Sequence, residues 1–385
     1  KRPKLRFPGF DEPWSIYKAE ELFKNVADKN HPTETVLTII QSKGTLPREQ
    51  AGRNIHYDDA SLANYKKVEQ GDFIIHLRSF EGGLEMANED GIVSPAYTIL
   101  RCKKPHSSLF YEAYFHTDEF INHILSKSVE GIRDGRQISY EAFKWLGLPY
   151  CDVSEQKKIA QLFCSLGHRI EKQQQMVDAL KKYKRGLLNQ IFSAISKGSQ
   201  RRKLRELVHV SGGKTPSMSN SLYWNGDIVW ISSKDMKSSR ISGSELKITN
   251  LALNEMTLYH PGTLLLVARS GILKHSLPLA ILEVDATINQ DIKALQVHGC
   301  NAFYLYYAIL SQEDTIIRTL VKTGTTVQSL MMDSFLNIEI PTPDIDQQQR
   351  IIDKLAKLEK YVEVQEKELS LLSQMRNGLL QQLFI

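Results

Sequence analysis

Apolar residues recur at alternating spacings of four and three along two long stretches of the chain. On the first stretch this seam includes Ile159, Leu166, Ile170, Leu180 and Leu187. On the second stretch it includes Leu358, Val362, Leu372 and Leu379. A seam held for about five heptads predicts two long coiled-coil helices rather than isolated amphipathic ones.

A glutamine interrupts each seam at the same position, Gln173 in the first helix and Gln365 in the second. If a pseudo-twofold axis relates the two halves, the helices run antiparallel and these side chains meet near the crossing. A buried polar pair would then penalise slipped registers, in which each amide faces an apolar side chain. The alternative, in which both amides reach solvent at a wide seam, remains open.

The two helical stretches belong to an internal repeat. A shift of 192 residues aligns 149–192 with 341–384 without a gap, and thirteen of the 44 pairs are identical. The same shift places the aromatic run at Tyr111 on that at Phe303, and a shift of 191 places Gly71–Ser79 on Gly262–Ser270. The sequence therefore predicts two copies of one arrangement, each a globular part followed by a long helix. The matching ends GLLNQIF and GLLQQLF are each expected to pack at the foot of the opposite half.

The predicted fold class is α+β, with two mixed α/β globular parts, two long antiparallel coiled-coil helices and a pseudo-twofold internal repeat. Asp152 with Glu155, and Asp344 with Gln347, have the three-residue spacing of capping boxes at the helix starts. Strand candidates include Asp72–Leu77, Ile92–Leu100, Ile228–Ile231, Thr263–Ala268 and Leu279–Val284. The predicted segments are a first globular part (1–150), a helix (151–195), a linker (196–202), a second globular part (203–342) and a second helix (343–385).

Positive charge is concentrated between residues 155 and 206, where 13 Lys and Arg face 4 acids in a chain of net charge +5. This segment is interpreted either as a phosphate-facing surface or as a solvated helix face with a basic linker. No apolar run approaches the roughly 18–20 residues of a membrane span. Four cysteines without a CxxC spacing, and no signal-peptide pattern, favour a cytoplasmic protein with no membrane partner.

The motifs of common enzymes are missing from the sequence. GGKT at Gly212–Thr215 is not a phosphate loop, because Val208 stands where the earlier glycine of that motif is required, and Pro216 follows the threonine. His116 and His123, seven residues apart, are weak candidates for metal ligands. We therefore expect no catalytic residues, no metal and no cofactor bound by this chain.

The chain contains the segments NYKKVEQGDF (64–73), DGIVSPAYTIL (90–100), SGGKTPS (211–217), YWNGDIVWISSKDM (223–236) and two segments that run from Pro-x-x-Asp to LLxQxF. Together these segments resemble one family, the specificity subunits of type I restriction–modification systems. The resemblance implies that each globular part is a target recognition domain reading half of a split DNA sequence. Because the two parts differ in sequence, the implied target is bipartite and asymmetric.

The resemblance also implies partners for this chain. The helices would space the half-sites on double-stranded DNA and dock two modification (methyltransferase) subunits, while restriction (motor-nuclease) subunits join the same complex. S-adenosylmethionine, ATP and Mg²⁺ would be bound by those partner subunits. The alternative is a coiled-coil scaffold that joins proteins without reading DNA, although this would leave the two dissimilar globular parts unexplained.

Candidate DNA-contacting residues are polar side chains in loops that follow predicted strands. Arginine binds guanine edges or phosphate, serine serves either contact, and lysine suits phosphate. The candidates are Arg78, Ser79, Arg136, Lys214, Ser232, Ser233, Lys234, Arg269, Ser270 and Thr325. A structural arginine that ties down a loop is the equally weighted alternative for Arg78 and Arg269.

Overall fold

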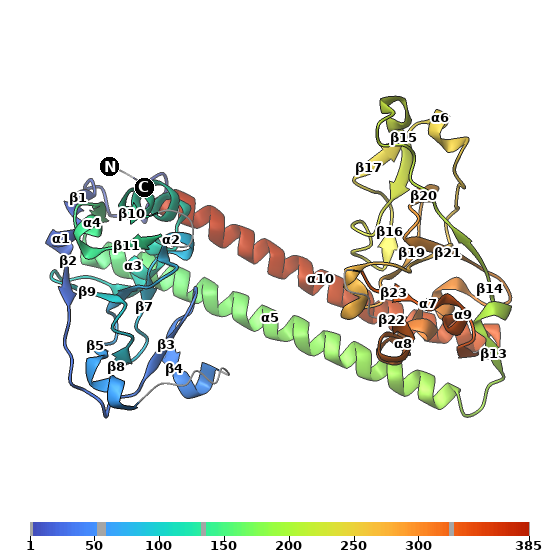
Figure 1. The fold of residues 1–385 in the computed structure, drawn as a ribbon, viewed down its shortest axis with the longest axis horizontal. Coiled ribbons are helices and arrows are strands. Elements are labelled where there is room, and N and C mark those ends of the chain that lie inside the picture. The colour runs from blue at the N-terminus through green and yellow to red at the C-terminus, as the bar shows by residue number, and fades with distance from the viewer. Residues whose placement is uncertain (1–2, 52–58, 132–135, 323–326, 385) are drawn as a thin grey trace. The chain divides into compact units, whose positions relative to one another are not determined.

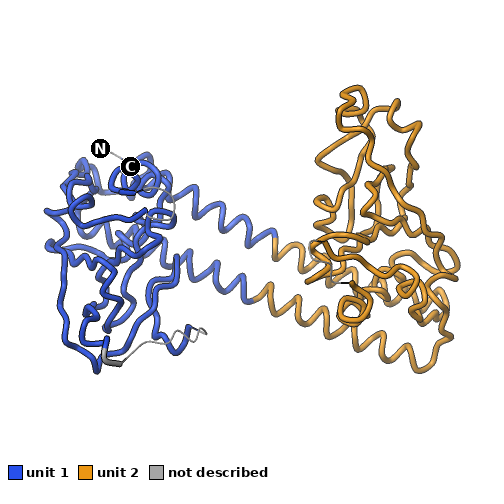
Figure 2. The backbone as a smooth tube through the Cα atoms, in the orientation of Figure 1, with its two compact units in different colours: residues 1–175, 367–385 blue, residues 176–366 orange. Residues whose placement is uncertain are grey.

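The computed structural model describes residues 3–51, 59–131, 136–322 and 327–384. The chain forms two compact units, residues 1–175 with 367–385 and residues 176–366 (Figure 2). Helix α5 (Val153–Ile195) and helix α10 (Ile345–Leu383) each contribute one portion to both units (Figure 1). The unit boundaries thus fall within the predicted helices, and each unit combines one globular part with portions of both. The candidate Thr325 lies outside the described residues.

Unit 1 is built from small antiparallel sheets around an aromatic core. Its largest described sheet has the order β2 (Phe23–Val26), β9 (Thr98–Cys102), β6 (Phe73–Ile75) and β7 (Glu85–Met86). The paired strands are β1 (Ser15–Lys18) with β12 (Gly147–Tyr150), β3 (Leu37–Ile40) with β4 (Gly44–Pro47), β5 (Lys66–Val68) with β8 (Gly91–Val93), and β10 (Val129–Glu130) with β11 (Gln137–Ile138). The helices are α1 (Ala19–Leu22), α2 (Ser79–Gly82), α3 (Ser108–Phe115) and α4 (Tyr140–Phe143).

The core of unit 1 joins the sheet, α3 and the end of α10. Phe23, Phe73 and Phe115 pack edge to face or tilted, with ring centroids 4.9–5.9 Å apart. Phe384, in GLLQQLF, contacts Phe110 with centroids 5.2 Å apart. The end of the second helix therefore packs beneath the first globular part, as predicted.

Unit 2 contains a larger sheet system. Among its described residues a five-stranded sheet runs β14 (Val208–Gly212), β21 (Ile292–Val297), β18 (Leu264–Val267), β19 (Leu279–Leu282) and β16 (Arg240–Ile241). A three-stranded sheet runs β17 (Leu246–Ile248), β15 (Trp224–Ile231) and β20 (Ala286–Ile288). The remaining pairs are β13 (Arg201–Lys203) with β24 (Glu339–Pro341) and β22 (Val321–Lys322) with β23 (Ser329–Leu330). The helices are α6 (Asn250–Leu253), α7 (Ala302–Leu310), α8 (Glu313–Leu320) and α9 (Met332–Phe335).

The core of unit 2 forms between the five-stranded sheet, α7 and the long helices. It includes Leu264, Leu295 and Tyr304 with Leu188 and Phe192 from GLLNQIF. Phe192 contacts Tyr304 with ring centroids 5.5 Å apart. The end of the first helix therefore packs beneath the second globular part, again as predicted.

The aspartates of the predicted capping boxes cap their helices, but Glu155 does not make its predicted contact. The Asp152 carboxylate accepts a hydrogen bond from the Ser154 N–H (2.8 Å), and the Asp344 carboxylate accepts one from the Gln347 N–H (2.7 Å). Glu155 instead turns away from the helix end, because Arg6 donates two hydrogen bonds to its buried carboxylate (2.9 and 2.7 Å). This pairing raises the pKa of Arg6. A charged partner distant in sequence replaced the local contact that the spacing indicated.

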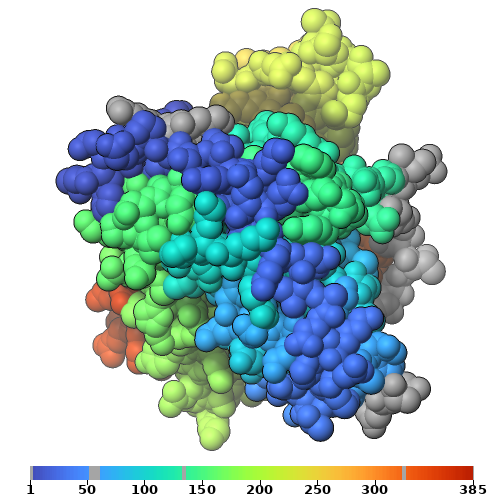
Figure 3. Space-filling view, turned by 90° about the vertical axis from the view of Figure 1, so that its left-hand side faces the viewer, coloured from blue at the N-terminus to red at the C-terminus, as the bar shows by residue number. Residues whose placement is uncertain are grey.

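The N-terminal segment lies on unit 1 against both long helices. Besides the pair between Arg6 and Glu155, the Leu5 N–H donates to the Gln382 carbonyl (2.9 Å), and the Trp14 indole donates to Glu155 (3.0 Å). In Figure 3 these first residues, in blue, lie across the surface beside the green residues that lead into α5. The segment is thus a structural part of unit 1.

The two long helices run antiparallel within each unit. In unit 1 Phe163 stacks on Phe384 and Arg169 pairs with Glu368 (3.2 Å). In unit 2 Lys181 pairs with Glu366 (2.6 Å), and Lys184 pairs with Glu359, which also accepts from the Tyr307 hydroxyl (3.0 Å). Later residues of α5 thus meet earlier residues of α10 in both cases.

The predicted seam lies between the two helices, with unequal burial along it. Ile159, Leu166, Val362 and Leu372 are between 1% and 7% exposed. The half-buried members are Ile170, Leu180, Leu187, Leu358 and Leu379, together with Gln173 and Gln365. No helix within the described part of the chain is long and apolar enough to span a membrane.

Candidate nucleic-acid interface

Three loops of unit 2 meet at the turn Asn289–Asp291, between β20 and β21. The Lys214 N–H donates to the Ile288 carbonyl (3.0 Å), and the Thr215 hydroxyl donates to Gln290. The Asn289 N–H donates to the Ile231 carbonyl at the end of β15 (2.9 Å). The Arg269 N–H donates to the Asp291 carbonyl (3.3 Å). We call Lys214, Thr215, Ser232–Lys234, Arg269 and Gln290 the turn cluster.

The turn cluster presents polar side chains at the surface of unit 2. Lys214, Lys234, Arg269 and Gln290 are all exposed, so their charged or amide ends face solvent. Arginine and glutamine can each bind a base edge with two hydrogen bonds, while lysine suits phosphate. The structure therefore brings together candidates that lie more than 50 residues apart in sequence and adds Gln290, which the sequence patterns did not single out.

Two serines of the candidate set have local structural roles. The Ser232 hydroxyl and N–H both donate to Asp235 (2.7 and 2.8 Å), which closes the turn after β15. The Ser270 hydroxyl accepts from the Ile272 N–H (3.4 Å) at the start of a short 3-10 helix. Both serines shape the loops that carry Lys234 and Arg269, and Ser233 is half-buried beside them.

The glycines before Lys214 permit a close approach between two backbone segments. A Cβ atom on Gly213 would lie 2.0 Å from the Ile288 carbonyl oxygen, which is far inside contact distance. The Lys214 carbonyl accepts from the indole of Trp230 (3.1 Å), a tryptophan only 6% exposed. The GGKT segment is thus a rigid support for Lys214 and needs no phosphate-loop chemistry.

In unit 1 the pair Arg78–Ser79 is divided between surface and core. Ser79 is fully buried and its hydroxyl accepts from the His76 N–H (2.9 Å), so the prediction that it faces DNA does not fit its position. Arg78 is exposed and pairs with Glu81 (3.1 Å). Arg136 is exposed and its guanidinium lies over the ring of Phe80 (4.3 Å), which places both arginines beside α2.

A buried glutamate holds the hairpin β3–β4 beside α2. The Glu85 carboxylate accepts hydrogen bonds from the Ser42 N–H (2.7 Å), the Gly44 N–H (2.9 Å) and His116 Nε2 (3.3 Å). Asn88 donates to the carbonyls of Lys43 and Thr45, both at 2.8 Å. These bonds hold the exposed tip Gln41–Lys43 in one conformation. Sequence patterns gave no signal for this clamp, because its partners lie 31 to 43 residues from Glu85.

The Glu85–His116 pair favours the ionised form of both groups. Burial alone would raise the pKa of Glu85, but hydrogen bonds from His116 and the Ser42 N–H leave that pKa below its usual value of 4.5. Burial would lower the pKa of His116, but the hydrogen bond to Glu85 leaves that pKa above its usual value of 6.5. Each group therefore stabilises unit 1 through the charge of the other.

Glu85→Gln is expected to destabilise unit 1 in a pH-dependent way. The contribution of Glu85 is lost as pH falls through its lowered pKa, and that of His116 is lost as pH rises through its raised pKa. The loss should thus be greatest between about pH 4.5 and 6.5, at roughly 1–3 kcal/mol. Melting curves across pH, with hydrogen exchange at the Ser42 and Gly44 amides, measure it. Glu89→Gln, an exposed neighbour, is the control, and equal behaviour of both variants would contradict the clamp.

The base of each globular part is tied to its long helix by the same set of bonds. Gln156 accepts from the Ser107 N–H (3.0 Å) and donates to the Cys151 carbonyl (2.9 Å). Gln348 accepts from the Asn301 N–H (2.9 Å) and donates to the Pro343 carbonyl (2.9 Å). Both glutamines are at most 2% exposed. These bonds fix the orientation of α3 and α7 relative to the starts of α5 and α10.

A buried tyrosine hydroxyl makes a second matching contact. Tyr111 donates to the Pro149 carbonyl (3.0 Å), and Tyr304 donates to the Pro341 carbonyl (2.6 Å). The structural equivalent of Tyr111 is therefore Tyr304 rather than Phe303. The ungapped alignment is wrong by one residue here, because it did not allow for a length difference between the aromatic helices and the prolines.

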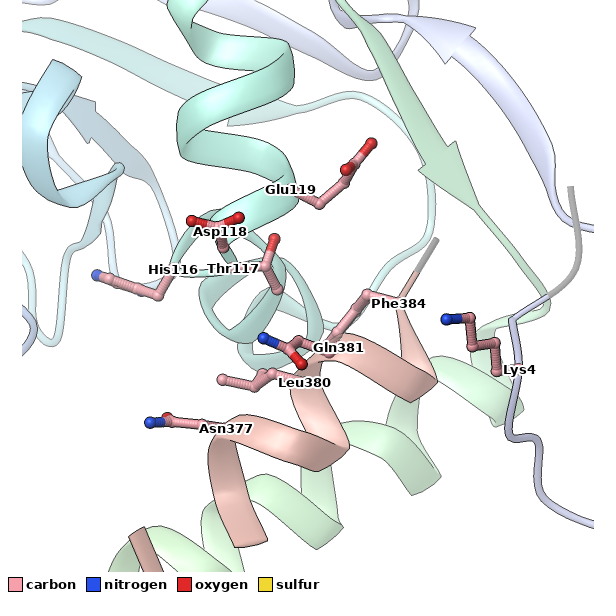
Figure 4. Close-up of a pocket in the computed structure, with 9 residues that line it drawn as sticks. All are labelled: Lys4, His116, Thr117, Asp118, Glu119, Asn377, Leu380, Gln381 and Phe384. Atoms are coloured by element: carbon pink, nitrogen blue, oxygen red, sulfur yellow. The ribbon is translucent and has the colours of Figure 1, made fainter. Parts of the chain in front are cut away.

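Unit 1 also has a surface cleft of about 650 Å³, shown in Figure 4. Asn377, Leu380 and Gln381 of α10 line it, with Phe384 directly after that helix. The other lining residues are Lys4 near the chain start and the residues after α3, His116, Thr117, Asp118 and Glu119. His116 is already engaged by Glu85 and by the Glu112 carbonyl (2.8 Å). Within the described ranges no three His, Cys, Asp or Glu side chains form a group that could hold a metal ion.

Comparison with known proteins finds a family that the second half of the chain resembles. Residues 196–374 match the model of a family described as type I restriction modification DNA specificity domain. The matched residues are therefore similar to the type I restriction specificity family. They include the whole turn cluster, so the candidate interface lies within the part of the chain that resembles a DNA specificity domain.

Curated relatives in this specificity family match part of the chain. The chain is 38% identical over 160 residues to the specificity subunit of the type I restriction enzyme EcoR124I/EcoR124II from Escherichia coli. It is 30% identical over 190 residues to the MjaIX specificity subunit from Methanocaldococcus jannaschii. The matched regions cover 40% and 48% of this chain, and 40% and 43% of those relatives, so the chain spans under half of their length.

The specificity-subunit fold extends over the entire chain. The S subunit of the type I restriction–modification system from M. genitalium superposes with a TM-score of 0.61, at 15% identity, over 100% of this chain and 99% of that one. A second structure, from work on assembly and conformational transition of the type I system, superposes with a TM-score of 0.56 at 15% identity, over 97% and 98% of the two chains. The mixed helix-and-sheet architecture is therefore that of this fold.

Proposed function

We propose that this chain is the sequence-reading subunit of a type I restriction–modification complex, recognising an asymmetric, bipartite double-stranded DNA target. The observation that carries the proposal is the turn cluster, an exposed set of lysine, arginine and glutamine side chains within a DNA specificity domain. In unit 1 the surface around Arg78, Arg136 and the clamped hairpin would read the other half of the target. The two surfaces carry different residues, which supports an asymmetric target.

We further propose that the chain is an internal pseudo-twofold repeat in which the helices set the spacing of the half-sites. The matched bonds of Gln156 and Gln348, and of Tyr111 and Tyr304, support a repeat at the level of each unit. The antiparallel ion pairs within each unit support a coiled-coil spacer. A helical spacer suits this role because its length is fixed at about 1.5 Å per residue.

In this proposal the catalytic chemistry resides on partner subunits in the cytoplasm. Two modification subunits would dock on the long helices and supply S-adenosylmethionine-dependent methyl transfer. Restriction subunits would supply the ATP- and Mg²⁺-dependent steps. This chain would determine which DNA sequence is recognised and how far apart the two half-sites lie.

A gel-shift experiment tests the proposed function. Graded concentrations of this chain, with and without its modification subunits, are mixed with DNA from a host carrying the system and with unrelated DNA of equal length. Sequence-specific retention that strengthens with the modification subunits is expected, because the partners add phosphate contacts to a chain of charge +5. Equal retention of all DNA, or none in either condition, would contradict the proposal.

Lys214→Ala is expected to weaken binding to all DNA sequences by a similar factor. A phosphate contact carries no sequence information, and its loss reduces the slope of log binding constant against log salt by about 1. Salt titrations on target and non-target DNA measure both quantities. Lys203→Ala, an exposed lysine on β13, is the control and should leave the slope unchanged. A Lys214→Ala variant with altered sequence preference would instead indicate base contact.

A further inference from the structure

The loop between β14 and β15 carries one large, exposed apolar side chain in polar surroundings. Met218 is 66% exposed, which is far more than the apolar residues of the neighbouring strands. The ten residues 211–220 include four serine or threonine hydroxyls, one lysine and no acidic residue. Hydroxyl and lysine groups suit contact with phosphate, but an exposed methionine among them has no such use.

Two tryptophans of β15 hold this loop in place. The Trp230 indole donates to the Lys214 carbonyl (3.1 Å), and the Trp224 indole donates to the Ser217 carbonyl (3.1 Å). The two indole rings pack edge to face with their centroids 5.1 Å apart. Met218 directly follows the second of these fixed carbonyls, so less entropy is lost when a ligand buries its side chain.

Met218 lies close to the turn cluster. It follows Thr215, whose hydroxyl donates to Gln290, by three residues, so the two Cα atoms are at most about 11 Å apart. The Asn220 N–H donates to the Ser217 carbonyl (3.2 Å) and closes a turn around Met218. Three base pairs of B-DNA rise about 10 Å. DNA bound at the turn cluster would therefore bring a neighbouring base pair within reach of Met218.

We infer that Met218 is a base-reading residue that recognises the C5-methyl group of a thymine in the half-site bound by unit 2. The inference rests on the proposed function and names one feature of its DNA target. Among the four standard bases only thymine presents a methyl group in the major groove, where an apolar side chain can contact it. Burial of that methyl group favours thymine over cytosine, and over deoxyuridine, which lacks only the methyl group.

A methionine supplies a contact that the polar residues of the turn cluster cannot make. Lysine, arginine and glutamine recognise hydrogen-bonding groups at base edges, and a methyl group neither donates nor accepts. The unbranched thioether side chain of methionine adapts to irregular apolar surfaces. The thymine read by Met218 should lie within about three base pairs of the position read by Gln290, because their mounting points are about 11 Å apart or less.

Replacement of each thymine of the target by deoxyuridine, one at a time, tests the inference. Binding is measured with the full chain and its modification subunits. For the wild type, one replacement in one half-site should weaken binding about fourfold, the contribution of one buried methyl group. Met218→Ala should weaken binding to the thymine target by at least this factor and make that same replacement neutral. Met218→Leu keeps an apolar side chain and should retain most of the preference for thymine.

Leu251→Ala is the matched control, because it removes a similarly exposed apolar side chain (51%) from α6 and should leave the thymine preference intact. The inference is overturned if no single replacement affects the wild type, or if Met218→Ala binds like the wild type. It is also overturned if Met218→Ala loses the same affinity for thymine and deoxyuridine targets, the pattern expected of insertion between base pairs. A wild type that does not prefer its target over unrelated DNA would instead contradict the proposed function, so the two failures can be distinguished.

Discussion

Insertion of seven residues into both long helices is expected to lengthen the spacer of the recognised DNA by up to about three base pairs. Seven residues add roughly 10 Å to a helix, and one base pair of B-DNA rises about 3.4 Å. A heptad preserves the phase of the seam. Placed after residue 175 in α5 and after residue 366 in α10, the insertions keep the pairs Arg169–Glu368 and Lys181–Glu366 within their own units. Binding to targets with a graded series of spacers measures the change.

The control for this experiment is insertion into α5 alone. The single insertion shifts one side of the seam against the other and should reduce stability and DNA binding together. If the double insertion folds and binds but keeps the original spacer, the helices do not set the spacing.

Arg269→Ala is expected to weaken binding to the cognate target by about 1–3 kcal/mol and to relax the preference at one position of one half-site. Arg269 is exposed within the turn cluster, and its backbone is fixed by Asp291 and by a bridge to Ser329. Arg269→Lys separates the two possible contacts, because lysine retains a phosphate contact but not a bidentate base contact. Binding to a panel of single-base target variants measures both effects.

Arg201→Ala is the matched control, since Arg201 is an exposed arginine of unit 2 that pairs with Glu339 (3.1 Å) on β24, outside the turn cluster. Its loss should leave affinity and preference within about twofold of the wild type. If Arg269→Ala keeps the sequence preference of the wild type, Arg269 does not contact a base.

The long helices could be predicted from sequence because a heptad seam is a local pattern. Their starts were also predictable from Asp152 and Asp344, whose side chains accept from N–H groups two or three residues away. Gln156 and Gln348 are identical in the 192-residue shift, but no local pattern indicated that each would bind the loop before the aromatic helix. Contacts between distant segments decide such roles, as Arg6 does for Glu155.

Strand boundaries were less accurate where a turn interrupted an apolar run. The predicted strand Ile92–Leu100 is two strands, β8 and β9, because Ser94–Ala96 contains Pro95, which cannot donate to a sheet. The predicted strand Asp72–Leu77 is shortened to Phe73–Ile75 because Asp72 is engaged by Arg101 (2.7 Å) and His76 begins the turn closed by Ser79.

The candidate interface was only partly predictable. Arg269 and Lys214 were found because charged residues in loops after strands are recognisable in sequence. Their proximity to Gln290 depends on the pairing of β20 with β15 and of β21 with β18, which no local pattern specifies. Ser79 was expected at the surface by analogy with Ser270, yet the helix α2 that begins at Ser79 turns its hydroxyl inward.

Methylome sequencing of cells that carry this chain with its modification subunits tests the central claim most directly. The account predicts methylation at one bipartite motif, with two different half-sites separated by a spacer of fixed length and unspecified sequence. A continuous motif, a palindrome, or the absence of sequence-specific methylation would contradict it.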